Sequence, residues 1–309
     1  MKILLTGGAG FIGSHIAEAL LEANYEVIIV DNLITGNEEN IPSGAKFYNR
    51  DICLSIDDIF VLEKPDYVIH QAAQVSVGKS LESPIDDAQI NILATINLLD
   101  ACVKYKIKKF IFASTAAVYG NPLYLPIDES HPTQPMSFYG LSKCTSELYI
   151  KLYSELFALP YSILRYANVY GPRQNANGEA GVIAIFAEKI INAKTLRIYG
   201  DGLQTRDFIF VKDVAKANVA ALKREHNEIV NISTNVQTSL LTLFFEFKNI
   251  MKNNSLLPVF CDPKFGDINN SLLSNDKAKN LLHWMPIHNI STGLKETILY
   301  YKNTIKHNG

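Results

Sequence analysis

The sequence contains few of the features that mark secreted, metal-binding or membrane proteins. Its four cysteines lack both CxxC and CxH spacing, which fits neither a disulfide framework nor a zinc site and indicates a reducing compartment. No apolar stretch reaches the roughly 20 residues that a membrane-spanning helix needs. The apolar run after Met1 leads directly into a glycine loop, so we expect no signal peptide. These absences predict a cytoplasmic protein without a metal site or a membrane partner.

The sequence also lacks an excess of either positive or negative charge. The formal net charge of the 309-residue chain is −2, so no strong attraction to nucleic acid is expected. A lysine cluster (Lys104, Lys106, Lys108 and Lys109) precedes an apolar run, and we interpret it as a solvent-exposed edge. With 48% hydrophobic residues, the chain can bury the core of one large domain or of two closely associated domains.

Short apolar runs alternate with helical patterns over the first 170 residues. We predict strands at residues 2–6 and 25–30, a third short strand before Asp51, and further strands at 67–70, 110–113 and 161–165. Apolar residues at helical spacing predict a first helix around residues 12–23 and longer helices at 85–105 and 139–156. The alternation predicts an α/β fold, with a doubly wound parallel sheet and helices on both of its faces. Beyond residue 170, turns and mixed short elements indicate a smaller second domain.

A glycine loop, GGAGFIG at residues 7–13, lies between the first predicted strand and the first predicted helix. Gly7 permits a tight turn, Gly10 lets a pyrophosphate approach the backbone, and Gly13 allows close helix–strand packing. The free N–H groups of the helix N-terminus favour phosphate charge. Asp31 ends the second strand, where an acid can bind the adenosine ribose hydroxyls and would repel the 2′-phosphate of NADP. The sequence therefore predicts NAD as the cofactor.

A tyrosine and a lysine, Tyr139 and Lys143, are four residues apart on one predicted helix face. A lysine ammonium beside a phenol favours the phenolate, which can take a proton from an alcohol while its carbon loses hydride. Thr115 ends the fifth predicted strand, at the sheet edge where ligands bind, and can hydrogen-bond the reacting oxygen. Tyr105 and Lys109 have the same spacing but no hydroxyl partner upstream, so we interpret that pair as coincidental.

Together these motifs resemble those of the extended short-chain dehydrogenase/reductases, and most closely UDP-glucose 4-epimerases and related nucleotide-sugar epimerases. The resemblance covers almost the whole chain. It is carried by TGGAGFIGSH (6–15), HQAAQVSV (70–77), STAAVYG (114–120), YGLSK (139–143), RYANVYGPRQ (165–174) and YGDGLQTRDFIFVKDV (199–214). It implies a Rossmann-type NAD-binding domain at 1–170 and a smaller C-terminal α/β nucleotide-sugar domain at 171–309, with the chain crossing between them. It also implies a homodimer through the helices at 85–105 and 139–156.

The resemblance assigns functional residues position by position. The implied catalytic residues are Thr115, Tyr139 and Lys143. The implied NAD-binding residues are Gly7, Gly10, Phe11, Ile12, Gly13, Asp31, Asn32, Leu33, Thr35, Gly36, Asp51, Ile52, Gln71, Ala72, Ala73, Gln74, Asn91, Tyr139, Lys143 and Tyr166. The implied residues for the UDP-sugar substrate are Ser76, Thr115, Asn168, Val182, Ile183, Leu196, Tyr199, Gln204, Arg206, Lys264, Asp267 and Ser271.

Two positions of the substrate set depart from common family patterns. Lys264 stands where the family often has arginine, and lysine keeps the charge but loses the bidentate fork that suits phosphate. Ser271 stands where some epimerases have a bulky tyrosine against the sugar C2 substituent. The smaller side chain leaves room for an N-acetyl group, so we expect UDP-GlcNAc and UDP-GalNAc to be accepted as well.

The reaction that the resemblance implies is a redox-neutral inversion at C4 of the sugar. Tyr139 removes the 4-hydroxyl proton, hydride passes to NAD⁺, and the 4-keto sugar turns over before the hydride returns. Dehydratases have Thr-Asp-Glu after the fifth strand, whereas this chain has Thr115-Ala116-Ala117, which supplies no acid or base for elimination. The alternatives are a UDP-glucuronate epimerase or decarboxylase, a 4,6-dehydratase and, more remotely, a non-catalytic NAD-binding regulator.

Overall fold

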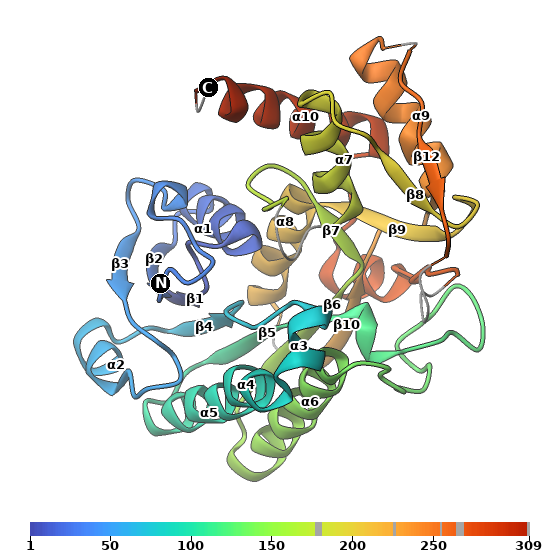
Figure 1. Cartoon of the computed structure of the whole chain (residues 1–309). Coiled ribbons are helices and arrows are strands. Elements are labelled where there is room, and N and C mark those ends of the chain that lie inside the picture. Colours follow the sequence, from blue (N-terminus) through green and yellow to red (C-terminus); the bar gives the residue numbers. More distant parts are fainter. Residues whose placement is uncertain (177–180, 225–226, 254, 264–268, 308–309) are drawn as a thin grey trace.

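A seven-stranded parallel sheet forms the centre of the molecule, in the order β10-β6-β5-β4-β1-β2-β3 (Figure 1). This computed structural model describes residues 1–309 except 177–180, 225–226, 254, 264–268 and 308–309. The strands of the sheet are β1 (Lys2–Thr6), β2 (Glu26–Asp31), β3 (Lys46–Asn49), β4 (Tyr67–His70), β5 (Lys109–Thr115), β6 (Tyr161–Tyr166) and β10 (Glu228–Ile232). The chain order reverses between β1 and β4, and ligands of such sheets bind beside the carboxyl ends of the strands at this switch point.

Strand β1 shows why these apolar runs form central strands. Leu4 faces one core, while its neighbours Ile3 and Leu5 face another on the opposite side of the sheet. All three side chains are fully buried, so the run is apolar at every position instead of alternating with polar residues. The sheet is therefore covered by helices on both faces.

One face of the sheet is covered by the helices shown below it in Figure 1. They are α2 (Asp57–Glu63), α4 (Pro84–Ala88), α5 (Ala94–Lys104) and α6 (Phe138–Phe157), with α3 (Val77–Glu82) packed on α4 and α6. A π turn at Gln89–Leu93 joins α4 to α5 without a break. Ile150 of α6 and Leu98 of α5 belong to the core on this side.

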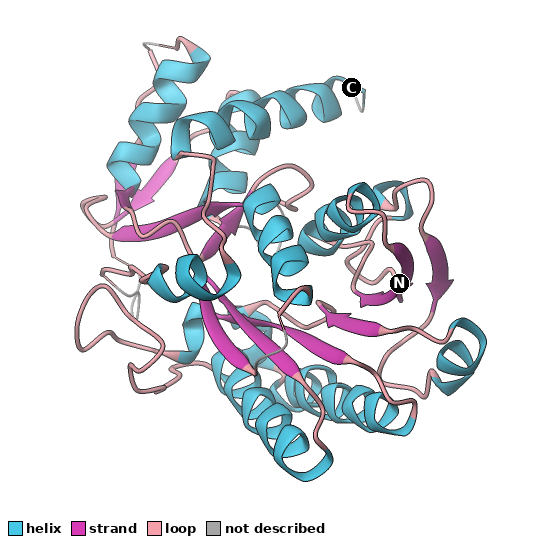
Figure 2. Cartoon of the chain, turned by 180° about the vertical axis from the view of Figure 1, so that it is seen from behind, coloured by secondary structure: helices cyan, strands magenta, loops and turns pink. Residues whose placement is uncertain are grey.

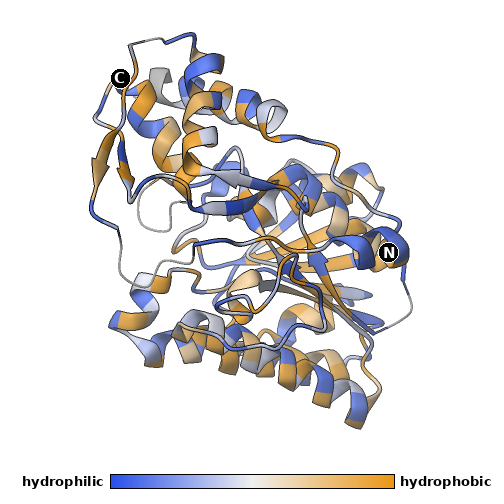
Figure 3. Ribbon diagram, turned by 90° about the vertical axis from the view of Figure 1, so that its right-hand side faces the viewer, coloured by the Kyte–Doolittle hydropathy of each residue, from blue (hydrophilic) through white to orange (hydrophobic). Residues whose placement is uncertain are grey.

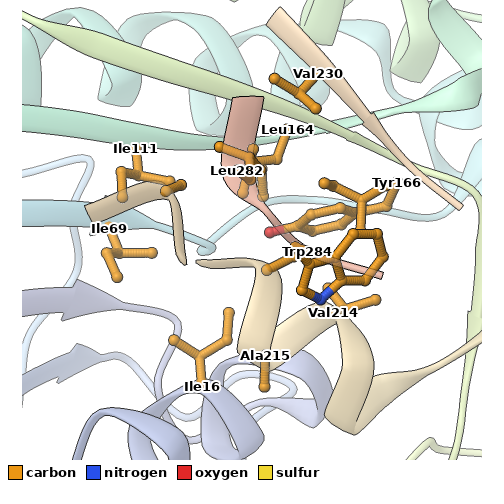
Figure 4. Packing of buried hydrophobic residues seen from close by; sticks show 14 of the residues in the cluster. Ile16, Ile69, Ile111, Leu164, Tyr166, Val214, Ala215, Val230, Leu282 and Trp284 are labelled. Carbon is orange, nitrogen blue, oxygen red and sulfur yellow. The ribbon is translucent and has the colours of Figure 1, made fainter. Parts of the chain in front are cut away.

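The other face is covered by α1 (Phe11–Glu22) and α8 (Val211–Leu222), which pack on each other. Figure 4 shows Ile16 of α1 and Val214 of α8 near the sheet, with Leu282 and Trp284 from near the end of the chain completing this core. Figure 2 shows the same two layers of helices from behind. Segments far apart in sequence thus close the face next to the glycine loop.

The C-terminal unit lies above the main sheet and has its own core. Its elements are β7 (Asn168–Tyr170), α7 (Val182–Ile191), β8 (Arg197–Tyr199), β9 (Thr205–Phe210), β11 (Gln237–Ser239), α9 (Leu240–Met251), β12 (Val259–Cys261) and α10 (Ile290–His307). Strand β9 pairs with β7 and β11, and β8 pairs with β12. In Figure 3 the helices of both units carry hydrophobic and hydrophilic stretches, as expected of helices buried on one side.

Most predicted elements agree with the structure to within one or two residues. The helix predicted at 85–105 is the continuous segment Pro84–Lys104, but its π turn was not predicted. The lysine cluster is only partly a solvent-exposed edge. Lys109 is 2% exposed, and its ammonium donates to the carbonyls of Ala221 and Arg224 at the end of α8. That part of the interpretation was wrong because the side chain caps a helix end that lies far away in sequence.

The predicted division at residue 170 stays a prediction. Strand β10, which lies beyond it, pairs in parallel with β6 of the main sheet. The part of the chain that the structure describes contains no helix long and apolar enough to cross a membrane.

Candidate active site

A cleft of about 920 Å³ lies between the main sheet and the C-terminal unit. It brings together residues that the sequence singled out as cofactor-binding, catalytic and substrate-binding. Those that line it are Gly10, Phe11, Ile12, Thr35, Gly36, Thr115, Tyr139, Tyr166, Asn168, Val182, Ile183, Tyr199, Gln204 and Arg206. The loop after β1, the N-terminus of α6 and the elements β7, α7, β8 and β9 of the C-terminal unit therefore share one cleft.

The glycine loop forms the turn from β1 into α1. Gly7 has a φ of +70°, and a Cβ there would come within 2.6 Å of the Ala72 backbone nitrogen. A Cβ at Gly13 would come within 2.0 Å of the Gly7 carbonyl oxygen, so α1 can approach the turn only without a side chain. Gly10 differs, because a Cβ there would meet only the Gly7 oxygen, at 3.3 Å, among the described residues. Gly10 caps α1 without a side-chain hydrogen bond, which leaves the helix N-terminus to accept an anion.

Asp31 holds the two loops that would contact the adenosine. Its carboxylate accepts hydrogen bonds from the backbone N–H of Ala9 at 3.0 Å and of Leu33 at 2.9 Å. Asn32 donates to Asp51 at 3.3 Å, which joins the ends of the second and third strands. The carboxylate lies at the end of β2 beside the glycine loop, where a 2′-phosphate would meet negative charge.

The predicted catalytic pair, Tyr139 and Lys143, lies in the first two turns of α6. Ser137 caps this helix by accepting from the Gly140 N–H at 3.0 Å, which fixes the turn that presents Tyr139 to the cleft. The Lys143 ammonium donates to the Ala113 carbonyl at 3.0 Å and lies 4.6 Å from the ring centre of Phe112. Burial lowers the pKa of Lys143 to about 8, although the carboxylates of Asp87 and Glu147 oppose this change.

Thr115 is the last residue of β5 and lines the cleft with Tyr139. Its hydroxyl oxygen accepts from the Ala117 N–H at 3.1 Å, and the hydroxyl proton remains available to a reacting oxygen. Ala116 and Ala117 follow in a single helical turn and supply no acid or base beside it.

Several predicted cofactor residues frame the cleft without lining it. Asn91 is 1% exposed. Its side-chain oxygen accepts from the Gln74 N–H and its side-chain nitrogen donates to the Gln74 carbonyl, each at 2.9 Å. It lies in the π turn, which places its amide under the loop after β4. Gln71 donates to the Tyr166 hydroxyl at 2.9 Å, and Asn218 of α8 donates to the same hydroxyl at 2.8 Å. The role of Asn218 was not foreseen, because α8 is distant in sequence.

The described lining of the cleft contains no aspartate or glutamate. Its charged members are all cationic, namely Lys79, Arg173, Lys189, Arg197 and Arg206. Only Arg206 was among the sequence-predicted site residues. The spacing of Val182, Ile185, Phe186 and Lys189 on one face of α7 could have indicated Lys189, whereas Lys79 and Arg197 carry no such signal. A lining of this kind favours ligands with several negative charges.

Three described substrate residues of the prediction, Ser76, Leu196 and Ser271, are not part of the described lining, and Ser76 instead caps α3 by accepting from the Lys79 N–H at 3.2 Å. Leu196 is 1% exposed in the core of the C-terminal unit, and its neighbour Arg197 lines the cleft instead. The Ser271 N–H donates to the Thr205 carbonyl at 3.2 Å, one residue from Arg206, but Ser271 is not part of the described lining. Lys264 and Asp267 lie outside the described residues.

The residues present fit a bound dinucleotide. At Gly10 the backbone is open enough for a pyrophosphate to approach it closely, and the N-terminus of α1 has no competing side-chain cap. Asp31 stands where the ribose of a dinucleotide would lie. The cleft continues from this loop past Tyr139 to Arg206, which leaves room for a second ligand beside the dinucleotide.

Comparisons with known proteins agree with this geometry. The structure of a UDP-glucose 4-epimerase from Thermotoga maritima, with UDP-glucose, is 43% identical with a TM-score of 0.96, covering 99% of this chain and 100% of that one. A UDP-glucose 4-epimerase of Mycolicibacterium smegmatis is 35% identical over 98% of this chain and 99% of its own length. A dTDP-D-glucose 4,6-dehydratase of Bos taurus is also 35% identical, over 99% of this chain and 90% of its own length. Residues 3–233 match the NAD dependent epimerase/dehydratase family, and the chain belongs to that family.

Proposed function

We propose that this protein is an NAD-dependent UDP-sugar 4-epimerase that interconverts UDP-glucose and UDP-galactose. The observation that carries the proposal is one cleft lined by the glycine loop, by Thr115 with Tyr139, and by Arg206. The likeness to the Thermotoga maritima epimerase, whose structure holds UDP-glucose, supports the choice of substrate.

The predicted catalytic residues and Arg206 each have a defined task in this reaction. NAD, when bound, accepts a hydride from C4 of the sugar and returns it. Tyr139 holds and transfers the proton of the 4-hydroxyl, and Thr115 orients the oxygen of that group. Lys143 favours the phenolate form of Tyr139. Arg206 holds the diphosphate with its guanidinium fork, so that the sugar can turn while the nucleotide stays in place.

Sequence identity favours an epimerase, because a relative of that kind is 43% identical and the dehydratase of Bos taurus is 35% identical, and the chemistry of the cleft supports the same choice. Elimination of water needs an acid and a base near the sugar. Ala116 and Ala117 follow Thr115 here, and the described lining of the cleft has no carboxylate. Epimerisation needs neither group, which favours it over dehydration.

We further propose that UDP-GlcNAc and UDP-GalNAc are substrates, because Ser271 is small and lies beside the start of β9. A cytoplasmic location is proposed on the four free thiols, which suit a reducing compartment.

A homodimer through α5 and α6 is proposed as well. Along α6, the apolar side chains of Leu141, Leu148 and Leu152 are 49%, 60% and 47% exposed and recur at helical spacing on one face. Contiguous exposed apolar surface of this kind typically marks a protein interface.

The test is to incubate the purified protein, without added cofactor, with UDP-glucose, UDP-galactose, UDP-GlcNAc, UDP-GalNAc and UDP-glucuronate, each in a separate reaction. We expect the C4 epimer of UDP-glucose and of UDP-galactose, measured by NMR or chromatography. We also expect the C4 epimers of the two N-acetyl sugars. Loss of water or of CO₂ from any substrate would contradict the proposal in favour of a dehydratase or a decarboxylase. No turnover by protein that carries NAD would indicate a regulator.

A further inference from the structure

A buried ion pair lies directly behind the catalytic residues. Glu147 of α6 is 1% exposed and Arg165 of β6 is 3% exposed. The guanidinium donates to both carboxylate oxygens of Glu147, from Nε at 2.9 Å and from Nη2 at 2.6 Å. The Ser114 hydroxyl donates to the same carboxylate at 2.5 Å. The pair therefore joins α6, β5 and β6, each of which also carries a residue that lines the cleft.

Glu147 lies one helical turn after Lys143, on the same face of α6. The groups around the Lys143 ammonium are the carboxylates of Asp87 and Glu147, the buried ring of His70 and, one turn earlier on α6, the Tyr139 phenol. The pKa of His70 is held well below its usual range by burial and then by the Lys143 charge, so His70 stays neutral. Asp87 and Glu147 are the two negative charges that oppose the effect of burial on Lys143.

Stability alone is a weak reason for such a pair. A buried ion pair can often be replaced by apolar residues of similar volume without loss of stability, because desolvation consumes much of the attraction. This pair also leaves the Arg165 Nη1 atom without a hydrogen-bond partner in the described structure. Its placement beside Lys143 is better explained by the charge that it presents there.

We propose that Glu147, oriented by Arg165 and Ser114, is a positioning residue that keeps Lys143 charged beside Tyr139. It contacts neither substrate nor cofactor and acts only through the lysine. The proposal rests on the proposed function for its catalytic meaning. Its physical content, the ionisation of Tyr139, can be measured without any sugar.

The test replaces Glu147 with glutamine, which keeps the volume and one acceptor oxygen but removes the charge. Tyr139 ionisation is followed in the NAD-loaded protein by ultraviolet difference absorption against Tyr139→Phe in the same background. Loss of the counter-charge favours neutral Lys143. The pH at which Tyr139 is half ionised, its midpoint, is therefore expected to rise by about one unit. At pH 7, kcat for epimerisation should then fall about tenfold with little change in KM, and it should recover at higher pH.

Two controls separate charge from structure. Glu155→Gln removes an exposed acid of the same helix and should leave the midpoint unchanged. Glu147→Asp keeps the charge and should stay close to the wild-type midpoint. If Glu147→Gln does not fold, because Arg165 is left unpaired, the double variant Glu147→Gln with Arg165→Met removes both charges and should still raise the midpoint.

An unchanged Tyr139 midpoint in folded Glu147→Gln, or in the folded double variant with Arg165→Met, would overturn the proposal. A fall in kcat by the same factor at every pH would also overturn it, since that is the signature of a purely structural role. If the wild type epimerises no UDP-sugar but the midpoint still rises in the variant, the proposed function fails while the role of Glu147 stands.

Discussion

At the scale of single residues, Lys109 and Lys143 show how position decides what a buried ammonium does. Burial lowers the pKa of both to about 8. Lys143 donates to the carbonyl of Ala113 near the carboxyl end of β5, beside the residues that line the cleft. Lys109 begins the same strand and caps the end of α8, at the opposite edge of the sheet. The same side chain is therefore part of the site at one end of the strand and a structural cap at the other.

Lys109→Met tests the cost of the structural cap. On folding, the wild-type lysine must lose either its water or its proton, and this lowers the free energy of unfolding. The loss of free energy is fully present below pH 8 and fades as the pH approaches the unfolded pKa of 10.5. Between pH 8 and pH 10, the wild type should gain about 2 kcal/mol of unfolding free energy relative to the methionine variant. Urea unfolding of both proteins at several pH values measures this difference. A difference that does not change with pH would contradict the assignment.

The comparison of sequence with structure is clearest at the same scale. Thr115 and Tyr139 could be predicted to share one site because each stands at the end of a strand or the start of a helix, and both line the cleft. Glu147, Asn218 and Arg197 could not be found. Each acts through a neighbour that is distant in sequence or faces a cleft whose shape depends on the packing of two units.

At the scale of elements, the β1–α1 turn separates two uses of glycine. At Gly13 the space is taken by the Gly7 carbonyl, and at Gly10 it is open toward the cleft. Gly13 is required by packing, whereas Gly10 leaves space that the proposed pyrophosphate would use. The apolar runs predicted this turn and its neighbouring strands because parallel strands are buried on both faces. The π turn at Gln89–Leu93 was not predictable, since its apolar pattern differs little from that of an ordinary helix.

Paired alanine substitutions distinguish the two glycines. Gly13→Ala should lower the unfolding free energy by about 1–3 kcal/mol, because the added methyl group overlaps the Gly7 carbonyl. Gly10→Ala should unfold close to the wild type but retain less NAD, because its methyl group takes the space of the pyrophosphate. Thermal unfolding and the NAD content of the purified proteins are the measurements. A Gly10→Ala protein with full NAD content would contradict the proposed position of the pyrophosphate.

At the scale of the whole molecule, α6 and the C-terminal unit lie on different sides of the main sheet (Figure 1). The exposed apolar face of α6 offers a surface for a second copy. The proposed dimer would bury Leu148 and Leu152. Because the predicted catalytic pair lies at the start of the same helix, association would also restrain the helix that positions Tyr139.

Leu148→Glu combined with Leu152→Glu should convert the protein to a monomer. Two unpaired carboxylates in an apolar interface should raise the dissociation constant by at least about 100-fold. Light scattering coupled to size-exclusion chromatography measures the mass. Leu257→Glu, at a 74% exposed position of the C-terminal unit, is the matched control and should remain dimeric. Equal masses for all three proteins would argue against this interface.

The last strand of the main sheet has a consequence for biosynthesis. Strand β10 pairs with β6 only after residue 232 has been made, and α8, which covers α1, precedes it by a few residues. Until then the nascent chain presents an open sheet edge and an uncovered helix face, both of which invite pairing with other chains. The part that is synthesised first therefore cannot complete its fold first. Residues 168–208, most of the far side of the cleft, are made before the main sheet is complete.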